Sequence, residues 1–323
     1  MKRIMLCLFG LFLLLEASAQ QVRFLVNDGI SDQRLISAIE NNLTHFLTSI
    51  NVAAAAKTRP VLADIPMSAD ASGSFLLLWD NMPFRVEEDA IVERVLRTYG
   101  GYQVRNVPIT LTQDQNAYQE LVIDLNNKGD ITRVNLALPN QLYLKVIPNG
   151  AEVSDLRHRQ MILDYVEQFR TSYNRKDIDF LEKVFSDDAL IITGRVVKKK
   201  AGDRSVVLKD QQEIQYTRHQ KKEYLDRLKN KVFPQAEYIR VHFSDIKVTR
   251  HPTLDGFYGV MLRQNYESSV YADEGYLFMI WDFRDENRPQ IHVRTWQPYW
   301  MDDAHTRQLE EKKVFTINDF TLK

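Results

Sequence analysis

The sequence predicts an α+β fold in two domains, the second of which packs a long helix in a curved antiparallel sheet. Apolar residues recur at helical spacing over residues 32–50 and again over residues 156–173. Extended segments with connectors of hairpin length follow one another over residues 238–299. The sequence Pro-Asn-Gly at residues 148–150 lies between the two regions and is typical of a linker.

Composition and net charge limit the classes of function. The chain has 323 residues, a length that favours two domains. Hydrophobic residues make up 44% of it and charged residues 26%, which is ordinary for a globular protein. The formal net charge of −1 supplies no long-range attraction to nucleic acid or to an anionic membrane surface. We therefore expect no nucleic-acid partner.

The first 19 residues have the pattern of a secretory signal peptide. An apolar segment at residues 4–15 follows two basic residues, and it is shorter than the roughly 20 residues of a membrane-spanning helix. We expect cleavage after Ala19, export to the periplasm or the medium of a bacterium, and no membrane span in the mature chain. Cys7, the single cysteine, lies in this segment, so the mature chain is expected to fold without disulfides.

The first domain, residues 20–148, is expected to combine two amphipathic helices with at least three antiparallel strands. The helices are predicted over residues 32–50 and 86–99, with a short buried strand or helix end at residues 75–79. The sequence Asn-Asn-Lys-Gly at residues 126–129 is the clearest hairpin turn of this region. The extended segments are 21–26, 102–111, 118–125 and 131–138.

The second domain, residues 155–300, follows a linker at residues 149–154 and precedes a tail at residues 301–323. Its first elements are predicted to be a long helix over 156–173, a short helix over 178–185, a strand over 189–193, an insertion over 194–212 and a third helix over 220–230. Four extended segments then form an antiparallel meander, at 238–250, 257–271, 276–284 and 290–299. In the tail we expect a short helix through Lys313, followed by an edge strand or a contact with the first domain.

The order of elements in the second domain resembles the nuclear transport factor 2-like superfamily, whose α+β cone is cystatin-like and is shared by ketosteroid isomerase and SnoaL-type cyclases. Most of the resemblance lies in D-I-D-F-L-E-K-V-F-S-D-D-A-L-I-I-T-G at residues 177–194, and the element order extends it over 155–300. The pairing with a signal peptide and a first α+β domain also resembles exported Bacteroidetes proteins of unassigned role. The match is one of fold, which alone does not imply a function.

The resemblance implies a curved sheet that wraps the long helix and leaves an apolar funnel at its open end. Enzymatic members of the superfamily place a carboxylate, usually Asp, in that funnel together with Tyr or His donors. Burial in such a wall raises the pKa of a carboxyl group, so that it can act as an acid or a base near neutral pH.

Asp282 is the candidate catalytic carboxylate. It stands between aromatic residues in the strand Met-Ile-Trp-Asp-Phe-Arg at residues 279–284. The alternative is that it faces solvent or pairs with Arg294 across the following hairpin. The register decides between the two, because a shift of one residue moves every side chain of a strand to the opposite face.

Further residues on the same strands and on the long helix are candidates for ligand binding. The full set is Tyr165, Tyr266, Trp281, Asp282, His292 and Arg294. The structural alternatives are a cation–π pair between Trp281 and Arg294 and a core position for the tyrosines. The seven histidines lack metal-ligand spacing, and no phosphate-binding loop or nucleophile elbow is found, so we predict neither a metal nor a cofactor.

Three functions are compatible with these features. The first is a non-catalytic exported protein that binds a small apolar ligand or a partner protein through the second domain. The second is an isomerase or lyase similar to ketosteroid isomerase or the SnoaL proteins, using a pocket Asp with Tyr or His. The third is a structural or assembly component of the cell envelope, with a homodimer formed through the open sheet face. The lack of a catalytic motif favours the first.

Overall fold

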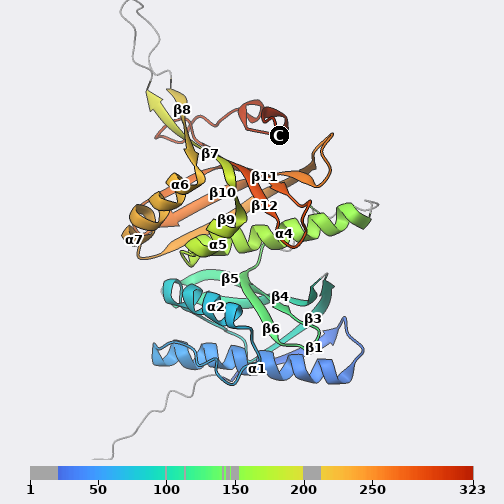
Figure 1. Cartoon of the computed structure of the whole chain (residues 1–323). Coiled ribbons are helices and arrows are strands. Elements are labelled where there is room, and N and C mark those ends of the chain that lie inside the picture. The colour runs from blue at the N-terminus through green and yellow to red at the C-terminus, as the bar shows by residue number, and fades with distance from the viewer. Residues whose placement is uncertain are drawn as a thin grey trace, which may run out of the picture.

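The computed structural model describes residues 21–98, 100–112, 114–139, 142, 146, 153–198 and 212–322. These residues form two halves, each built on its own six-stranded sheet with its own buried core (Figure 1). The predicted α+β class is confirmed. The expected signal peptide, most of the expected linker and the middle of the insertion lie outside the described residues. No helix in the described part of the chain is long and apolar enough to cross a membrane.

The N-terminal half, residues 21–139, packs two helices on one face of a mixed sheet. Its elements are β1 (Arg23–Asp28), α1 (Gln33–Ala56), α2 (Ala69–Asn81), β2 (Phe84–Arg85), β3 (Ala90–Thr98), β4 (Gly101–Leu111), β5 (Asp114–Leu125) and β6 (Ile131–Leu136). The strand order is β1-β3-β4-β5-β6, with β2 beside β4, and β1 runs parallel to β3. The predicted hairpin at residues 126–129 joins β5 to β6.

For two segments of this half, the structure decides or overturns the prediction made from the sequence. Residues 75–79 belong to helix α2, whose Ser68 cap accepts a hydrogen bond from the backbone N–H of Ala71. The helix predicted over 86–99 is wrong, because most of this segment is strand β3. Its buried residues, Ile91 and Val95, are four apart, a spacing that fits one face of a helix and one face of a strand equally well. The β-branched composition of the segment favours the strand.

The C-terminal half, residues 153–322, wraps a curved sheet around one long helix. Its helices and helical turns are α4 (Val153–Asn174), α5 (Ile178–Val184), α6 (Lys221–Arg227), a π-helical turn (Leu228–Val232) and α7 (Phe233–Gln235). Its strands are β7 (Phe185–Lys198), β8 (Gln212–Gln220), β9 (Ile239–Arg250), β10 (Phe257–Ser268), β11 (Ala272–Asp282) and β12 (Gln290–Pro298). The strand order is β8-β7-β12-β11-β10-β9, in which only β12 and β7 are parallel.

Alternate residues of the strands divide between the inside and the outside of this sheet. Leu277, Met279 and Trp281 of β11 pack in the large core that surrounds α4. Phe278 and Ile280 of the same strand pack in a small cluster on the outer face. The period of two therefore identifies which face of the sheet each side chain of β11 occupies.

The C-terminal tail covers part of the outer face. It contains 3-10 turns at Glu311–Lys313 and Ile317–Asp319 rather than the longer helix expected from the sequence. Ile317 and Phe320 pack against the outer cluster, and the Phe320 ring stacks on Phe278 at 5.8 Å between centroids. Instead of forming an edge strand or contacting the N-terminal half, the two alternatives expected, this part of the tail packs on the outer face of the C-terminal sheet. A homodimer through the open sheet face, considered above with the third function, stays untested.

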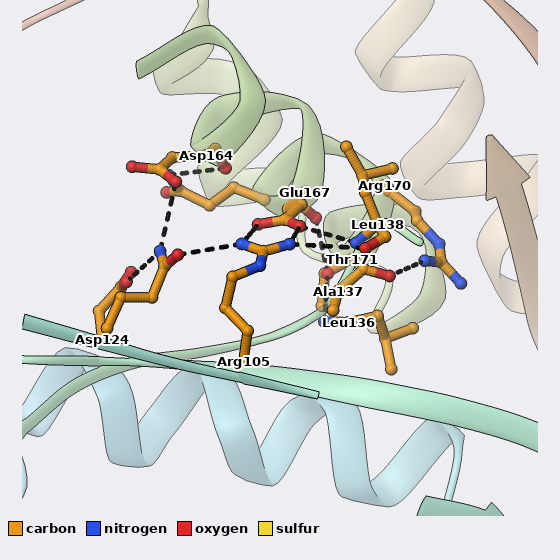
Figure 2. Close-up of polar contacts among 11 residues, drawn as sticks. Arg105, Asp124, Leu136, Ala137, Leu138, Asp164, Glu167, Arg170 and Thr171 are labelled. Carbon is orange, nitrogen blue, oxygen red and sulfur yellow. Dashed lines mark hydrogen bonds and ion pairs between the residues drawn. The ribbon is translucent and has the colours of Figure 1, made fainter. Parts of the chain in front are cut away.

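The two halves meet through a layer of buried charged and polar side chains between the first sheet and α4 (Figure 2). Arg105 of β4 forms an ion pair with Glu167 of α4, and Glu167 also accepts the backbone N–H of Leu138 at 2.7 Å. Both charged side chains are nearly inaccessible, with exposed fractions of 5% and 1%. We call this set of contacts the interface layer, and it includes Gln103, Asp124, Asp164 and Arg170 as described below.

Arg170 and Asp164 extend the interface layer along α4. The guanidinium of Arg170 donates to the carbonyl oxygens of Val241 and Ala137, at 2.6 and 2.7 Å, and to Gln119 Oε1 at 2.6 Å. Burial lowers the pKa of Arg170 to about 10. Asp164 accepts from Gln103 at 3.3 Å, and its pKa is raised well above the usual value by burial and by the negative charges of Asp124 and Glu167.

Candidate functional site

A pocket of about 550 Å³, here called the cone pocket, opens into the interior of the C-terminal half. Its walls come from the inner faces of β7, β8, β10, β11 and β12, from the C-terminal end of α4, and from α6 with the π-helical turn. The volume lies within the range of small-molecule sites, roughly 300–1,000 Å³. The lining residues are Tyr173, Thr193, Gly194, Arg195, Gln215, Thr217, Tyr224, Arg227, Leu228, Val232, Gln264, Tyr266, Tyr271, Asp273, Arg294 and Trp296.

Arg294 is the buried cation of this pocket. It is 5% exposed, and its guanidinium carbon lies 5.2 Å from the centre of the Tyr224 ring. Burial lowers its pKa, but nearby Tyr224, Tyr173 and Asp273 raise it by more, so the net pKa is raised and the group stays charged. The hydroxyls of Tyr173 and Tyr224 are hydrogen-bonded to each other at 2.6 Å. Within the described residues, no carboxylate lies within ion-pair distance of Arg294, and its Nε has no hydrogen-bond partner.

Asp273 supplies a carboxyl group to the same pocket. Burial raises its pKa to about 6, although a hydrogen bond from Tyr271 and the charge of Arg294 act in the opposite direction. One of its oxygens, Oδ1, is buried without a hydrogen-bond partner. Tyr266 lies on the neighbouring strand, and burial raises its pKa to about 12, so its phenol stays protonated at neutral pH. The pocket therefore holds a carboxyl group that titrates near pH 6 beside neutral phenols.

Buried polar atoms without partners gather at this pocket. Six such side-chain atoms occur in the part of the chain that the structure describes. Three of the six belong to residues that line the pocket, namely Asp273 Oδ1, Arg294 Nε and Trp296 Nε1. A buried polar group without a partner costs about 1–3 kcal/mol, so a molecule bound in this pocket would gain by supplying hydrogen bonds to these three atoms.

Two of the six residues predicted for ligand binding line the cone pocket, Tyr266 and Arg294. Tyr165 and Trp281 do not line it: Trp281 is buried in the core, and Tyr165 is partly buried and packs against that core, with the two ring centroids 5.4 Å apart. The alternative cation–π pair of Trp281 with Arg294 is wrong, because Arg294 stands opposite Met279 and its guanidinium lies over Tyr224.

Asp282 and His292 lie on the outer face of the sheet, so the prediction that they face the pocket is wrong. Asp282 forms an ion pair with Arg284 at 2.8 Å and lies 3.3 Å from His292 Nε2. Burial acts to raise the pKa of Asp282, but the hydrogen bonds and charge of Arg284 outweigh it and lower the pKa. A group with a lowered pKa on the outer face does not fit an internal general base.

The register explains both errors. Asp282 has the parity of Phe278 and Ile280, whose side chains pack outside, whereas the core residues of β11 have odd numbers. A bulge where β12 passes from Ile291 to Val293 places His292 outside, although Arg294, two residues later, points inward.

Four residues outside the predicted ligand-binding set also line the pocket, namely Asp273, Tyr173, Tyr224 and Trp296. Asp273 was assigned to a hairpin connector, but the structure places it in strand β11. Its parity matches that of Leu277, Met279 and Trp281, so extending the strand by a few residues would have placed it on the inner face. Tyr224 belongs to α6, the helix between β8 and β9. The spacing of apolar residues in the sequence does not predict where this helix packs against the sheet.

No protein family model matches the sequence, and no curated protein matches it. Solved structures similar to it include an NTF2-like protein from Cytophaga hutchinsonii, at 14% identity and a TM-score of 0.32, over 43% of this chain and 97% of that one. Nuclear transport factor 2 from Cryptosporidium parvum is similar at 6% identity and a TM-score of 0.33, over 44% and 94%. Hexachlorocyclohexane dehydrochlorinase LinA-type3 from Novosphingobium barchaimii is similar at 10% identity and a TM-score of 0.32, over 46% and 92%. Element order and strand order give the C-terminal half the nuclear transport factor 2-like fold.

Proposed function

We propose that the C-terminal half binds a small organic anion in the cone pocket, with Arg294 as the cationic anchor. The observation that carries the proposal is a buried arginine with an unpartnered Nε and, among the described residues, no carboxylate within ion-pair distance. A guanidinium presents its donors in a planar fork that matches a carboxylate or a phosphate. A bound anion would give this guanidinium the ion-pair partner that the described residues do not supply.

The rest of the wall defines the remainder of the ligand. The rings of Tyr173, Tyr224 and Trp296 offer flat apolar surface, while Asp273 and Gln264 offer hydrogen bonds. The ligand is therefore an amphiphilic molecule with one anionic group, rather than the purely apolar one that the resemblance implied. If the expected signal peptide at residues 1–19 is cleaved, the protein is an exported binding protein of the periplasm or the medium. N-terminal sequencing of the mature protein tests this export.

Calorimetric titration of the full chain with benzoate and with the neutral analogue benzamide tests the proposal. Benzoate should bind more tightly than benzamide, and Arg294→Met should remove the difference. The matched control is Arg284→Met, which removes an arginine from the outer face and should leave benzoate binding unchanged. Equal binding of the two probes, or a preference that survives Arg294→Met, would show that Arg294 is not an anion anchor.

A second candidate function is proton transfer, as in an isomerase or lyase, with Asp273 in the role first considered for Asp282. The favouring observation is that burial raises the pKa of Asp273 to about 6 inside an open pocket lined by Tyr266 and Tyr271. A β,γ-unsaturated ketone offered as substrate would be converted to its α,β isomer, which absorbance detects. Asp273→Asn should abolish the conversion and Asp282→Asn should preserve it; the absence of conversion by the wild-type protein leaves the binding function alone.

A further inference from the structure

A second hollow adjoins the cone pocket. This rim pocket has a volume of about 460 Å³ and shares five lining residues with the cone pocket. The shared residues are Gly194, Arg195, Tyr271, Asp273 and Trp296. Because they have these five residues in common, the two hollows adjoin, and we call the pair the cleft, with Arg294 at its inner end.

The two ends of the cleft carry opposite charge. Arg294 is the cation at the inner end, and Asp302 and Asp303 stand at the outer end. Asp302 accepts hydrogen bonds from Thr306, which lower its pKa and keep it ionised. A third rim carboxylate, Glu274, is already paired with Arg263, so it contributes little free negative charge.

Two arginines lie near the rim, and neither forms an ion pair with a carboxylate of the cleft among the described residues. Arg195 lies on the shared wall and donates to Gln215. Arg307 donates to Gln212, and its charge helps to lower the pKa of Asp302 without forming an ion pair among the described residues. His305 lies flat on Trp300, with centroids 5.1 Å apart and an interplanar angle of 6°, which gives the outer end an aromatic floor.

We infer that the ligand is a zwitterion, a free amino acid or a short peptide, held with its carboxylate at Arg294 and its ammonium group at Asp302 and Asp303. This inference rests on the proposed function, because it adds a second charged end to the anion bound there. Charge complementarity at both ends fixes the direction in which the ligand lies. The unpartnered Asp273 Oδ1 and Trp296 Nε1 stand between the two ends, where the peptide groups of the ligand would supply a donor and an acceptor.

Titration of the full chain with three forms of trialanine tests the inference: free at both ends, N-acetylated, and C-terminally amidated. Amidation should weaken binding at least about thirtyfold, because it leaves the buried cation unpaired. Acetylation should weaken binding about threefold, since the rim charges are exposed. Arg294→Met should remove only the first difference, and the double variant Asp302→Asn with Asp303→Asn only the second. Asp226→Asn, on the exposed face of α6, is the control and should change neither.

The outcomes separate this inference from the proposed function. If the acetylated and free peptides bind equally well, or if benzoate binds and no form of trialanine does, the zwitterion is wrong while the anion site remains. If the amide binds as tightly as the acid and Arg294→Met has no effect on either probe, the anion site is wrong as well. A preference for the free amine that persists in the double Asn variant would place the ammonium group elsewhere and overturn the assigned direction.

Discussion

The molecule contains two sets of buried polar side chains, the interface layer and the cone pocket, and they differ in how completely they are partnered. In the interface layer, Arg105 pairs with Glu167 (Figure 2). Arg170 donates to three oxygens, of which Figure 2 shows that of Ala137. In the cone pocket, Arg294 Nε and Asp273 Oδ1 have no hydrogen-bond partner. Arg105 and Arg294 are equally buried, each 5% exposed, so partnering and not burial distinguishes these two arginines.

The difference suggests different roles for the two sets. A buried network whose members are satisfied by the protein fixes one arrangement of its elements. A buried set that the protein leaves unsatisfied has donors and acceptors to offer to another molecule. Loss of a charge should therefore reduce stability in the interface layer and reduce binding in the cone pocket.

The largest expected effect is in the interface layer. Glu167→Ala leaves Arg105 buried without its carboxylate and should lower the free energy of unfolding by about 3–5 kcal/mol. Urea unfolding followed by tryptophan fluorescence measures the change. Asp226→Ala, which removes an exposed ion pair with Lys222, is the control and should cost less than about 1 kcal/mol. Equal losses in the two variants would contradict the assigned role of the layer.

Arg294→Met should change stability far less. It leaves no ion-paired carboxylate among the described residues without its partner, so the free energy of unfolding should stay within about 1 kcal/mol of the wild-type value. The same urea titration measures it, beside the loss of benzoate binding proposed above. A loss of stability as large as that of Glu167→Ala would mean that Arg294 is a structural residue.

Asp273 should make stability depend on pH. Its pKa is about 6 in the folded protein, whereas an unfolded Asp has a pKa of about 3.9. The folded state therefore binds the proton more tightly, so this stability is present below about pH 4 and is lost as the pH rises through 6, by about 2–3 kcal/mol. In Asp273→Asn the fall in unfolding free energy between pH 4 and pH 6 should be smaller by this amount.

Asp164 provides the comparison for that pH dependence. Burial and two nearby carboxylates raise its pKa as well, so it acts on stability in the same direction. Asp164→Asn should also flatten the pH profile of unfolding but leave the pH profile of benzoate binding unchanged. Asp273→Asn should change both, because ionised Asp273 repels the anion above pH 6. If Asp164→Asn shifts the binding profile equally, the two regions are coupled rather than separate.

The smallest effect is expected on the outer face. Asp282→Asn weakens an ion pair with Arg284, whose side chain is 60% exposed, and should lower the free energy of unfolding by less than about 1 kcal/mol. It should leave benzoate affinity unchanged, because Asp282 does not line the cone pocket. A clear loss of affinity in titration calorimetry would return Asp282 to the list of site residues.

Much of the second sheet could be predicted from the sequence because its strands alternate strongly and its connectors are short. The segment of β3 was wrongly predicted to be a helix because its two buried residues are four apart. This spacing fits the period of a helix and the period of a strand. The site was harder, because Asp273 and Asp282 are both carboxylates of one strand and only parity separates them. The interface layer had no signal in the sequence, since the partners Arg105 and Glu167 are 62 residues apart and meet only when both sheets are formed.

Helix α4 belongs to the interiors of both halves. Its Phe169 and Tyr173 pack inside the cone, while Glu167 and Arg170 face the first sheet. During synthesis the first sheet is made before this helix. Arg105 therefore has no counter-ion until the chain has been extended past residue 167. The two halves are therefore poor units for recombination: a cut at the linker would leave Arg105 uncovered and without its carboxylate on one fragment, and Glu167 and Arg170 exposed on the other.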